Sequence, residues 1–207
     1  MARRIGSDGA RTREAIREAA TRLIAQVGYE ALSMRRLAEE VGLGAAALYR
    51  YYPNKQAMLF KLLDTHMDEL LACWAKSRQG AAPDAELEVF TRFHIRHHWP
   101  RIDSLFLSYM ELRSLTPENF ARIEEKRNRY DRGLARILEE GRRAGLFAEM
   151  DARVTARAII ALLNGLTTWY RPDGPISREA IEDIYWNMVA RVVGAPQAEE
   201  NRCLERA

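Results

Sequence analysis

The sequence predicts an all-α fold of about nine helices. Apolar residues recur every three or four positions along most of the chain, which is the spacing of one face of a helix. Residues that cap or end helices stand between these segments, and no segment alternates apolar and polar residues as a half-buried strand does. The chain has 207 residues, of which 47% are hydrophobic and 29% charged, so it can bury a proper core.

Three short helices are expected in the first third of the chain. Each combines an apolar face with a residue that favours a helix end: a hydroxyl that caps the start, a glycine after the last turn, or a proline that cannot continue the helix. The expected segments are 12–27 followed by Gly28, 34–41 capped by Ser33 and followed by Gly42, and 45–52 followed by Pro53.

Six longer amphipathic segments are expected after Pro53. Their boundaries carry the same kinds of signal, including a hydroxyl, a proline and an acid in succession at Thr116-Pro117-Glu118. The expected helices are 55–78 capped by Asn54, 87–99 and 102–115 divided at Pro100, 117–144 followed by Gly145, a helix over 154–166 capped by Asp151, and a last one capped by Ser177 and ended by Gly194.

Positive charge is concentrated at the start of the chain. Residues 1–62 carry 11 Lys or Arg and 6 Asp or Glu, a balance of +5, whereas residues 63–207 carry 21 and 23, a balance of −2. This asymmetry indicates an N-terminal module that meets a polyanion and a near-neutral remainder with another role. The alternative is a merely solvated basic surface.

Several function classes are disfavoured by composition. No apolar run approaches the roughly 18 to 20 residues of a membrane-spanning helix, so we expect no membrane contact. The Arg3-Arg4 pair is not followed by the apolar segment of an export signal. Cys73 and Cys203 are too few and too far apart for a disulfide framework or a zinc knuckle, so we expect a cytoplasmic protein without a cofactor.

Residues 33–52 have the pattern of a helix-turn-helix: two short helices joined by a glycine-containing turn, after a supporting helix. A helix that enters the major groove needs a slim exposed face, with groups on both sides that hold phosphates. Ala45 and Ala46 are slim, and Leu48 and Tyr52 would anchor the opposite face. A purely structural helical hairpin would show the same spacing. The side chains that could hold phosphates are Ser33, Arg35, Tyr49, Tyr51 and Lys55.

The stretch 41–58, VGLGAAALYRYYPNKQAM, resembles the signature of the tetracycline-repressor (TetR) family. Gly28-Tyr29 and Leu32-Ser33-Met34-Arg35 stand where that family has its glycine-aromatic turn and its helix-opening hydroxyl, and the resemblance spans about residues 10 to 60. It implies a dimeric, ligand-controlled transcription regulator. It further implies that phosphates are held by Ser33, Arg35, Tyr49, Tyr51 and Lys55, and that Ala45, Ala46 and Arg50 face bases.

Two positions depart from the family pattern. Members often have a hydroxyl residue capping the recognition helix and a lysine just after it, where this chain has Gly44 and Ala45. Fewer hydrogen-bond donors then reach the groove. Base discrimination is expected to rely on Arg50, on contacts with thymine methyl groups and on DNA shape.

These signals divide the chain into four expected parts. A flexible basic arm covers 1–9, the helix-turn-helix DNA-binding domain covers 10–56, a helical ligand-binding and dimerisation domain covers 57–194, and a loose tail covers 195–207. The arm, with Arg3 and Arg4, either reaches a minor groove or only aids solubility.

The last two expected helices also predict a homodimer. Both carry apolar stripes, and the first has small residues at Ala158, Ala161 and Gly165 that let another helix approach closely. Pairing these helices with their copies gives a four-helix bundle, as the resemblance also implies. The alternative is that both helices complete the monomer core.

The segment 168–175, TWYRPDGP, resembles a stretch of TetR members that respond to coenzyme A thioesters, and 140–147 resembles that subgroup less specifically. An acyl-CoA needs an apolar channel together with cations or stacking rings. A generic hydrophobic effector, such as a drug or lipid, is the alternative. The predicted cations and ring are Arg113, Arg171 and Trp169, and the predicted channel residues are Phe106, Tyr109, Met110, Phe120, Leu163 and Leu166.

Other functions remain as alternatives. His94 and His98 lie one helical turn apart and adjoin His97, but zinc would need a further ligand, so we predict no metal site. A helical enzyme is disfavoured because no phosphate-cradling loop or nucleophile motif is present. The expected function is a repressor released by its effector from a palindromic double-stranded operator; the rival is an architectural DNA-binding protein without an effector.

Overall fold

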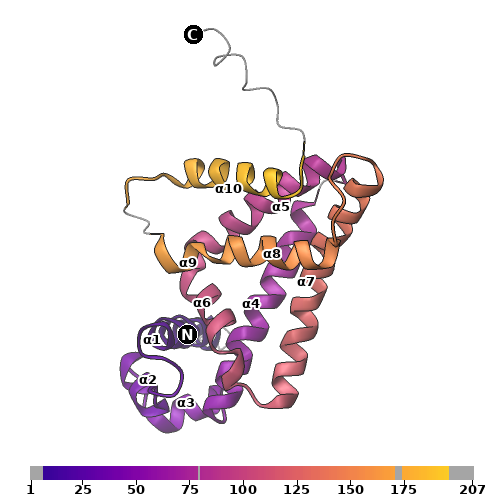
Figure 1. Ribbon diagram of the computed structural model, residues 1–207. Coiled ribbons are helices and arrows are strands. Elements are labelled where there is room, and N and C mark those ends of the chain that lie inside the picture. The colour runs from indigo at the N-terminus through magenta and orange to yellow at the C-terminus, as the bar shows by residue number, and fades with distance from the viewer. Residues whose placement is uncertain (1–6, 79, 171–173, 196–207) are drawn as a thin grey trace. The chain divides into compact units, whose positions relative to one another are not determined.

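The computed structural model describes residues 7–78, 80–170 and 174–195 (Figure 1). Over these residues the chain is all-α, as predicted, and forms no strand. It divides into two units: unit 1 comprises Met1–Glu69 and Arg101–Lys126, and unit 2 comprises Leu70–Pro100 and Arg127–Ala207. Arg3, Arg4, Arg171, Cys203 and the tail from 196 lie outside the described residues.

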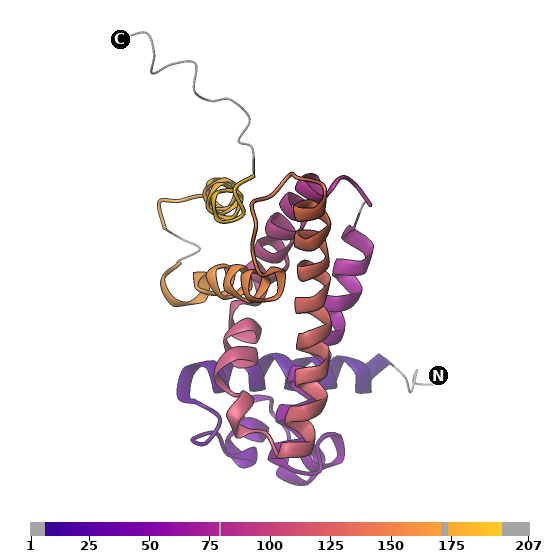
Figure 2. The ribbon, with the colours of Figure 1, turned by 45° about the vertical axis from the view of Figure 1, so that its right-hand side comes forward.

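Unit 1 contains the helices of the basic first third and the middle of the chain. Helix α6 crosses α1, as Figure 2 shows with α6 in pink and α1 in indigo, and α2 packs against both α1 and α3. Fully buried Ile16, Leu37 and Leu48 join these helices in one core. The elements are α1 (Ser7–Val27), α2 (Met34–Glu40), α3 (Ala45–Tyr51), the first part of α4 (Lys55–Ser77), α6 (Ile102–Met110), the 3-10 helix η2 (Leu112–Ser114) and the start of α7 (Pro117–Arg143).

Unit 2 contains the remaining parts of α4 and α7 and most of the last third of the chain. Helix α5 packs against both α10 and α8. Phe90 of α5, Leu134 of α7 and Val189 of α10 are fully buried in this unit. The further elements are α5 (Pro83–His98), the 3-10 helix η1 (Trp99–Arg101), whose last residue belongs to unit 1, α8 (Ala152–Asn164), α9 (Leu166–Trp169) and α10 (Arg178–Val192).

The predicted capping residues are confirmed. The side chain of Ser33 accepts the backbone N–H of Arg36, and Ser177 accepts that of Ala180 in the same way. Asp151 accepts two N–H groups at the start of α8. Because these groups satisfy backbone donors that a helix leaves unpaired, they set where each helix begins.

Several helix ends differ from the sequence prediction. Helix α1 begins at Ser7 and not at residue 12, so residues 7–9, which were expected in the flexible arm, are helical. The helix expected over 154–166 ends at Asn164, and the separate short helix α9 begins at Leu166. Helix α5 begins at Pro83 and not at residue 87, since proline fits the first helical position and Asp84 and Glu86 favour its positive end. Helix α6 ends at Met110, and the 3-10 turn η2 replaces its expected last turn. No helix among the described residues has the length and hydropathy needed to cross a membrane.

Candidate functional site

Helix α3 has two different faces. Leu48 is fully buried, and Tyr52, the residue after the helix, is 5% exposed, so this face is anchored in the core of unit 1. The solvent face begins with two methyl side chains, which project little and let the backbone approach another molecule closely. The exposed residues of α3 are Ala45, Ala46, Tyr49 and Arg50. The predicted base-facing residues therefore share one exposed surface.

The start of α3 shows the effect of the predicted departure at Gly44. Gly44 is the N-cap residue, with an extended backbone and no side-chain cap. Its carbonyl accepts the N–H groups of Ala47 and Leu48, at 2.9 and 3.2 Å. The first turn of α3 is consequently covered only by glycine and methyl groups.

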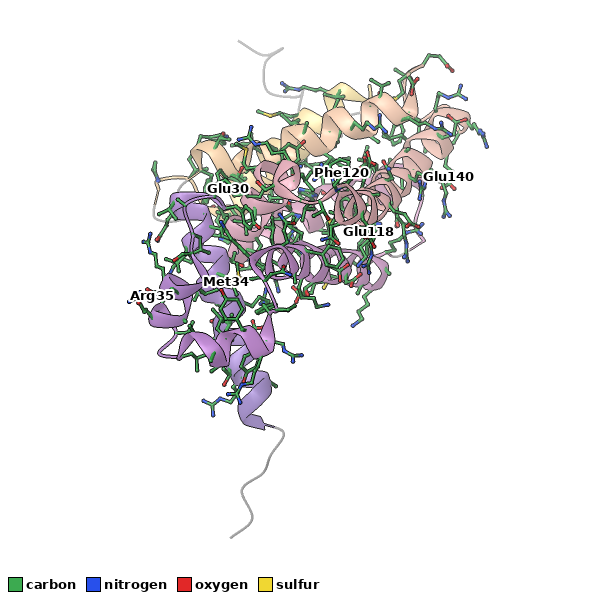
Figure 3. All side chains as sticks on the ribbon, turned by 90° about the horizontal axis from the view of Figure 1, so that it is seen from below. Glu30, Met34, Arg35, Glu118, Phe120 and Glu140 are labelled. Carbon is green, nitrogen blue, oxygen red and sulfur yellow. The ribbon has the colours of Figure 1, made fainter. Side chains whose placement is uncertain are left out.

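The predicted phosphate-binding side chains lie in unit 1, and they differ in the contacts that they already make within the protein. Arg35 is exposed and pairs with Glu39 at 3.1 Å; Figure 3 shows it at the outer edge of α2. Ser33 is exposed, but its oxygen caps α2, which leaves its hydroxyl hydrogen available for a phosphate. The Lys55 ammonium donates to the carbonyl of Glu30 at 3.1 Å and lies 4.2 Å from the centre of the Tyr29 ring.

A groove of about 590 Å³ in unit 1 adds cations that the sequence prediction missed. Arg13 and Lys61 line it beside the predicted phosphate ligand Tyr51, and the Arg13 guanidinium lies 6.0 Å from the centre of the Tyr51 ring. The capping residues Asn54 and Thr116 also line this groove. The only sequence signal for Arg13 and Lys61 was their place in the basic first third.

The predicted effector residues fall into two groups. Of the nine, five belong to unit 1 and three described ones belong to unit 2, while Arg171 lies outside the described residues. In unit 2, Leu163 and Leu166 are buried and Trp169 is about half exposed. In unit 1, Phe106 is half-buried, and the exposed members are Tyr109, Met110, Arg113 and Phe120.

A polar cluster lies inside unit 2. The two ring nitrogens of His94 contact the Tyr130 hydroxyl and the Asn164 side-chain oxygen, both at 3.1 Å. Since that oxygen can only accept, His94 Nε2 carries the hydrogen and Tyr130 donates to Nδ1. Burial lowers the pKa of His94 to about 4, although its hydrogen bond with Asn164 acts in the opposite direction. His94 is therefore a neutral link between α5, α7 and α8.

This arrangement differs from a metal site. His94 and His98 lie one turn apart as predicted, with ring centres 4.5 Å apart. Both nitrogens of His94 already have polar partners within unit 2. Among the described residues, no group of three or more His, Cys, Asp or Glu is placed to hold a metal ion.

A second groove, of about 780 Å³, lies on unit 2 along α5 and the end of α4. Its walls combine the cationic side chains Lys76, Arg92 and Arg96 with apolar Val89 and Phe93. The two arginines also hold α10, because Arg96 Nε donates to both oxygens of the buried Glu182 at 2.9 Å and Arg92 donates to Asp183 at 2.7 Å. Among the residues that the structure describes, none of those predicted to bind the effector lines this groove.

Helices α8 and α10 expose apolar side chains on unit 2. Ile184, Met188 and Val192 follow one another at four-residue spacing on α10 and are 41 to 53% exposed. On α8, Val154 is 63% exposed, and the predicted small residues Ala158 and Ala161 are exposed as well. A continuous apolar stripe of this kind is typical of a surface that is covered by a partner.

Comparison with known families matches both parts of the chain. Residues 16–62 match the family described as bacterial regulatory proteins, tetR family. Residues 80–193, more than half of the chain, match the tetracyclin repressor-like C-terminal domain. The first match covers the exposed face of α3 and the second covers the apolar stripes of α8 and α10.

Individual relatives agree with these matches. The transcriptional repressor KstR2 of Mycobacterium tuberculosis is 24% identical over 177 residues, which cover 83% of this chain and 88% of that protein. The crystal structure of the regulator PfmR of Thermus thermophilus has a TM-score of 0.78 and 30% identity, covering 88% of this chain and 99% of that one. AibR, crystallised with isovaleryl coenzyme A and operator DNA, has a TM-score of 0.81 and 26% identity, covering 89% and 100%.

The buried His94 predicts a pH dependence of stability. Its pKa is about 4 in the folded chain and about 6.5 when unfolded, so between these pH values the unfolded chain binds the additional proton. The free energy of unfolding should then fall as the pH is lowered from about 6.5 to 4. Urea unfolding at a series of pH values should show that His94→Gln flattens this dependence by about one proton. Parallel curves for the two proteins would contradict a neutral buried His94.

Proposed function

Since this chain belongs to the tetracycline-repressor family of bacterial transcription regulators, we propose that it is a dimeric repressor released from a palindromic operator by a small hydrophobic or acyl-CoA effector. Family membership makes the chain a DNA-binding regulator and not an enzyme. We assign DNA binding to residues 10–56, and ligand binding and dimerisation to 57–194. The observation that carries the DNA-binding assignment is the exposed, alanine-lined face of α3.

The proposed DNA contacts follow from the two faces of α3. Leu48 and Tyr52 anchor the helix, while Ala45 and Ala46 allow close approach to base edges. Arg50 is the long donor on the exposed face, and it is the candidate for a bidentate contact with guanine. Phosphate contacts are assigned to Ser33, Arg35, Tyr49, Tyr51 and Lys55, with Gly44 at the start of the helix.

The proposed dimer uses the apolar stripes of α8 and α10. Burying Ile184, Met188 and Val192 against a second copy would remove exposed apolar side chains from water, and each such side chain stabilises an interface by about 1 kcal/mol or more. The exposed alanines of α8 permit close helix approach. Two copies also place two reading helices on successive major grooves, which one short helix cannot do alone.

The proposed effector combines an apolar part with an anionic part. AibR, a relative with 26% identity, was crystallised with isovaleryl coenzyme A, which supports a thioester for this chain too. In unit 2, the predicted residues Leu163 and Leu166 are buried apolar side chains, Trp169 is about half exposed, and Arg171 follows them in the sequence. The cationic groove along α5 offers further charge for phosphate groups. The effector residues in unit 1 remain predictions.

We propose that helix α4 transmits effector binding to the DNA-binding helices. It is one uninterrupted helix that begins at Lys55 in unit 1 and includes Trp74 in unit 2. An effector that binds better to the released conformation would shift α4 and the spacing of the two reading helices. The coupling expected for such a switch is about 1 to 3 kcal/mol. An architectural DNA-binding protein without an effector is the remaining alternative.

Two arginines should separate backbone contacts from base contacts. Arg35→Ala should weaken binding to every duplex and reduce the slope of log affinity against log salt by about one, because one phosphate contact is lost. Arg50→Ala should lower affinity for the preferred duplex about 5- to 100-fold and change random-sequence binding little. Fluorescence anisotropy with DNA flanking the chain's own gene and with a random duplex measures both.

The control is Arg132→Ala, which removes an exposed charge of α7 in unit 2. Identical behaviour of Arg35→Ala and Arg50→Ala would refute the assignments.

A charge on the α10 stripe should break the dimer. Met188 is 43% exposed, so Met188→Glu should leave the folded chain intact but place a carboxylate in the proposed interface. Light scattering after size-exclusion chromatography should give the monomer mass, and operator affinity should fall with it. Met188→Leu keeps the apolar surface and should remain dimeric. A Met188→Glu chain that stays dimeric would show that α10 is not the interface.

The effector class is tested by release of bound DNA. Isovaleryl-CoA and a longer straight-chain acyl-CoA should lower affinity for the preferred duplex about 5- to 150-fold in a shift assay, whereas the matching free acids should have little effect. Equal release by the free acids would favour a generic hydrophobic effector. Tight DNA binding that no compound changes would favour the architectural alternative.

A further inference from the structure

The end of α6 touches the turn that leads into the reading helices. Helix α1 ends at Val27, and Gly28 follows with φ of +81°, its N–H bonded to the carbonyl of Ile24 at 2.8 Å. In the common glycine-ended helix, the next N–H bonds back to the same helix. Here the N–H of Tyr29 donates instead to Oε1 of Glu111, at 3.0 Å. A residue 82 positions away therefore completes the end of α1.

The second oxygen of Glu111 is also occupied. The Ser114 hydroxyl donates to Glu111 Oε2 at 2.8 Å, within the 3-10 turn that replaces the expected last turn of α6. One oxygen of the carboxylate is thus bonded to the neighbouring 3-10 turn, and the other is bonded to the α1–α2 turn. A glutamine could offer only one acceptor oxygen, so glutamate suits both bonds.

Further hydrogen bonds join the same turn of η2 to α4. The side chain of Gln56 donates to the carbonyl of Ser114 and accepts the N–H of Thr116. Its neighbour Lys55 donates to the carbonyl of Glu30, which brings α4 back to the α1–α2 turn. These hydrogen bonds thus link three segments of unit 1. We call the residues that make them the Glu111 latch: Tyr29, Glu30, Lys55, Gln56, Glu111, Ser114 and Thr116.

Glu111 lies at two helix ends, and hydrogen bonds from the Tyr29 N–H and the Ser114 hydroxyl hold its carboxylate there. It caps the C-terminus of α6 and lies beside the C-terminus of α1, and both helix ends carry partial negative charge.

We propose that Glu111 is a positioning residue that holds the α1–α2 turn, and with it α2 and α3, in the geometry that reads DNA bases. The proposal rests on the DNA-binding function assigned above. Without the latch, the turn must be ordered when DNA binds, and the entropy of ordering opposes specific binding. Random-sequence binding needs only charge near phosphates, so it does not depend on this geometry.

The test compares a preferred duplex, namely the one bound most tightly in DNA flanking the chain's own gene, with a random duplex of equal length. Glu111→Ala should lower affinity for the preferred duplex about tenfold and leave random-duplex affinity within about twofold. Glu111→Gln, which keeps one acceptor oxygen, should restore part of the preference. Ser114→Ala should give a smaller loss, because the bond to Tyr29 is kept. Hydrogen exchange at the Tyr29 amide should accelerate in the same order.

Glu124→Ala is the matched control, since Glu124 is an exposed carboxylate of unit 1 within α7; it should change neither affinity. Equal losses on both duplexes, together with a lower melting temperature, would overturn the proposal in favour of a purely structural bond, and unchanged affinities would overturn it as well. If the wild-type chain itself showed no salt-dependent preference for any duplex, the failure would lie with the proposed DNA-binding function and not with Glu111.

Discussion

The reading surface depends on the packing of two helices that are too short to be stable alone. Helices α2 and α3 have seven residues each, whereas isolated helices shorter than about 12 to 15 residues are marginal in water. Their stability must come from the burial of Leu37 and Leu48 in the core of unit 1. The same burial orients the exposed face, because a helix with one anchored side can present only the opposite one. In the proposed function, the contacts that stabilise α3 therefore also orient the face that would contact DNA.

In unit 2, polar and charged side chains are buried among the helices. His94 is paired by Tyr130 and Asn164, and Glu182 by Arg96. A buried polar group costs free energy unless it is hydrogen-bonded, and a charge costs more unless it is paired. These pairs join α5 to α7, α8 and α10. The apolar stripe of α10 stays exposed, and in the proposed dimer a second copy covers it.

Hydrogen bonds in unit 1 join the end of α1, the end of α6 and the start of α4. Helix α6 stops at Met110, and the released turn places Glu111 and Ser114 where they can bind the end of α1. Helix α4 begins beside the same turn through Lys55 and Gln56. A DNA-reading module held at its turns by side chains of other helices can respond to small shifts of those helices. A module held only by its own core could not.

The all-α class, the capping residues and the helix-turn-helix could be predicted from the amino-acid sequence, because helical spacing and caps such as Ser33 and Asp151 are local and need no tertiary partner. The sequence also identified the surface of α3, since Leu48 and Tyr52 lie one turn apart. The end of α6 at Met110, the bond from Tyr29 to Glu111 and the neutral, buried state of His94 became visible only in the folded chain. The last two depend on partners 36 to 82 positions away, and periodicity within one helix carries no information about such partners.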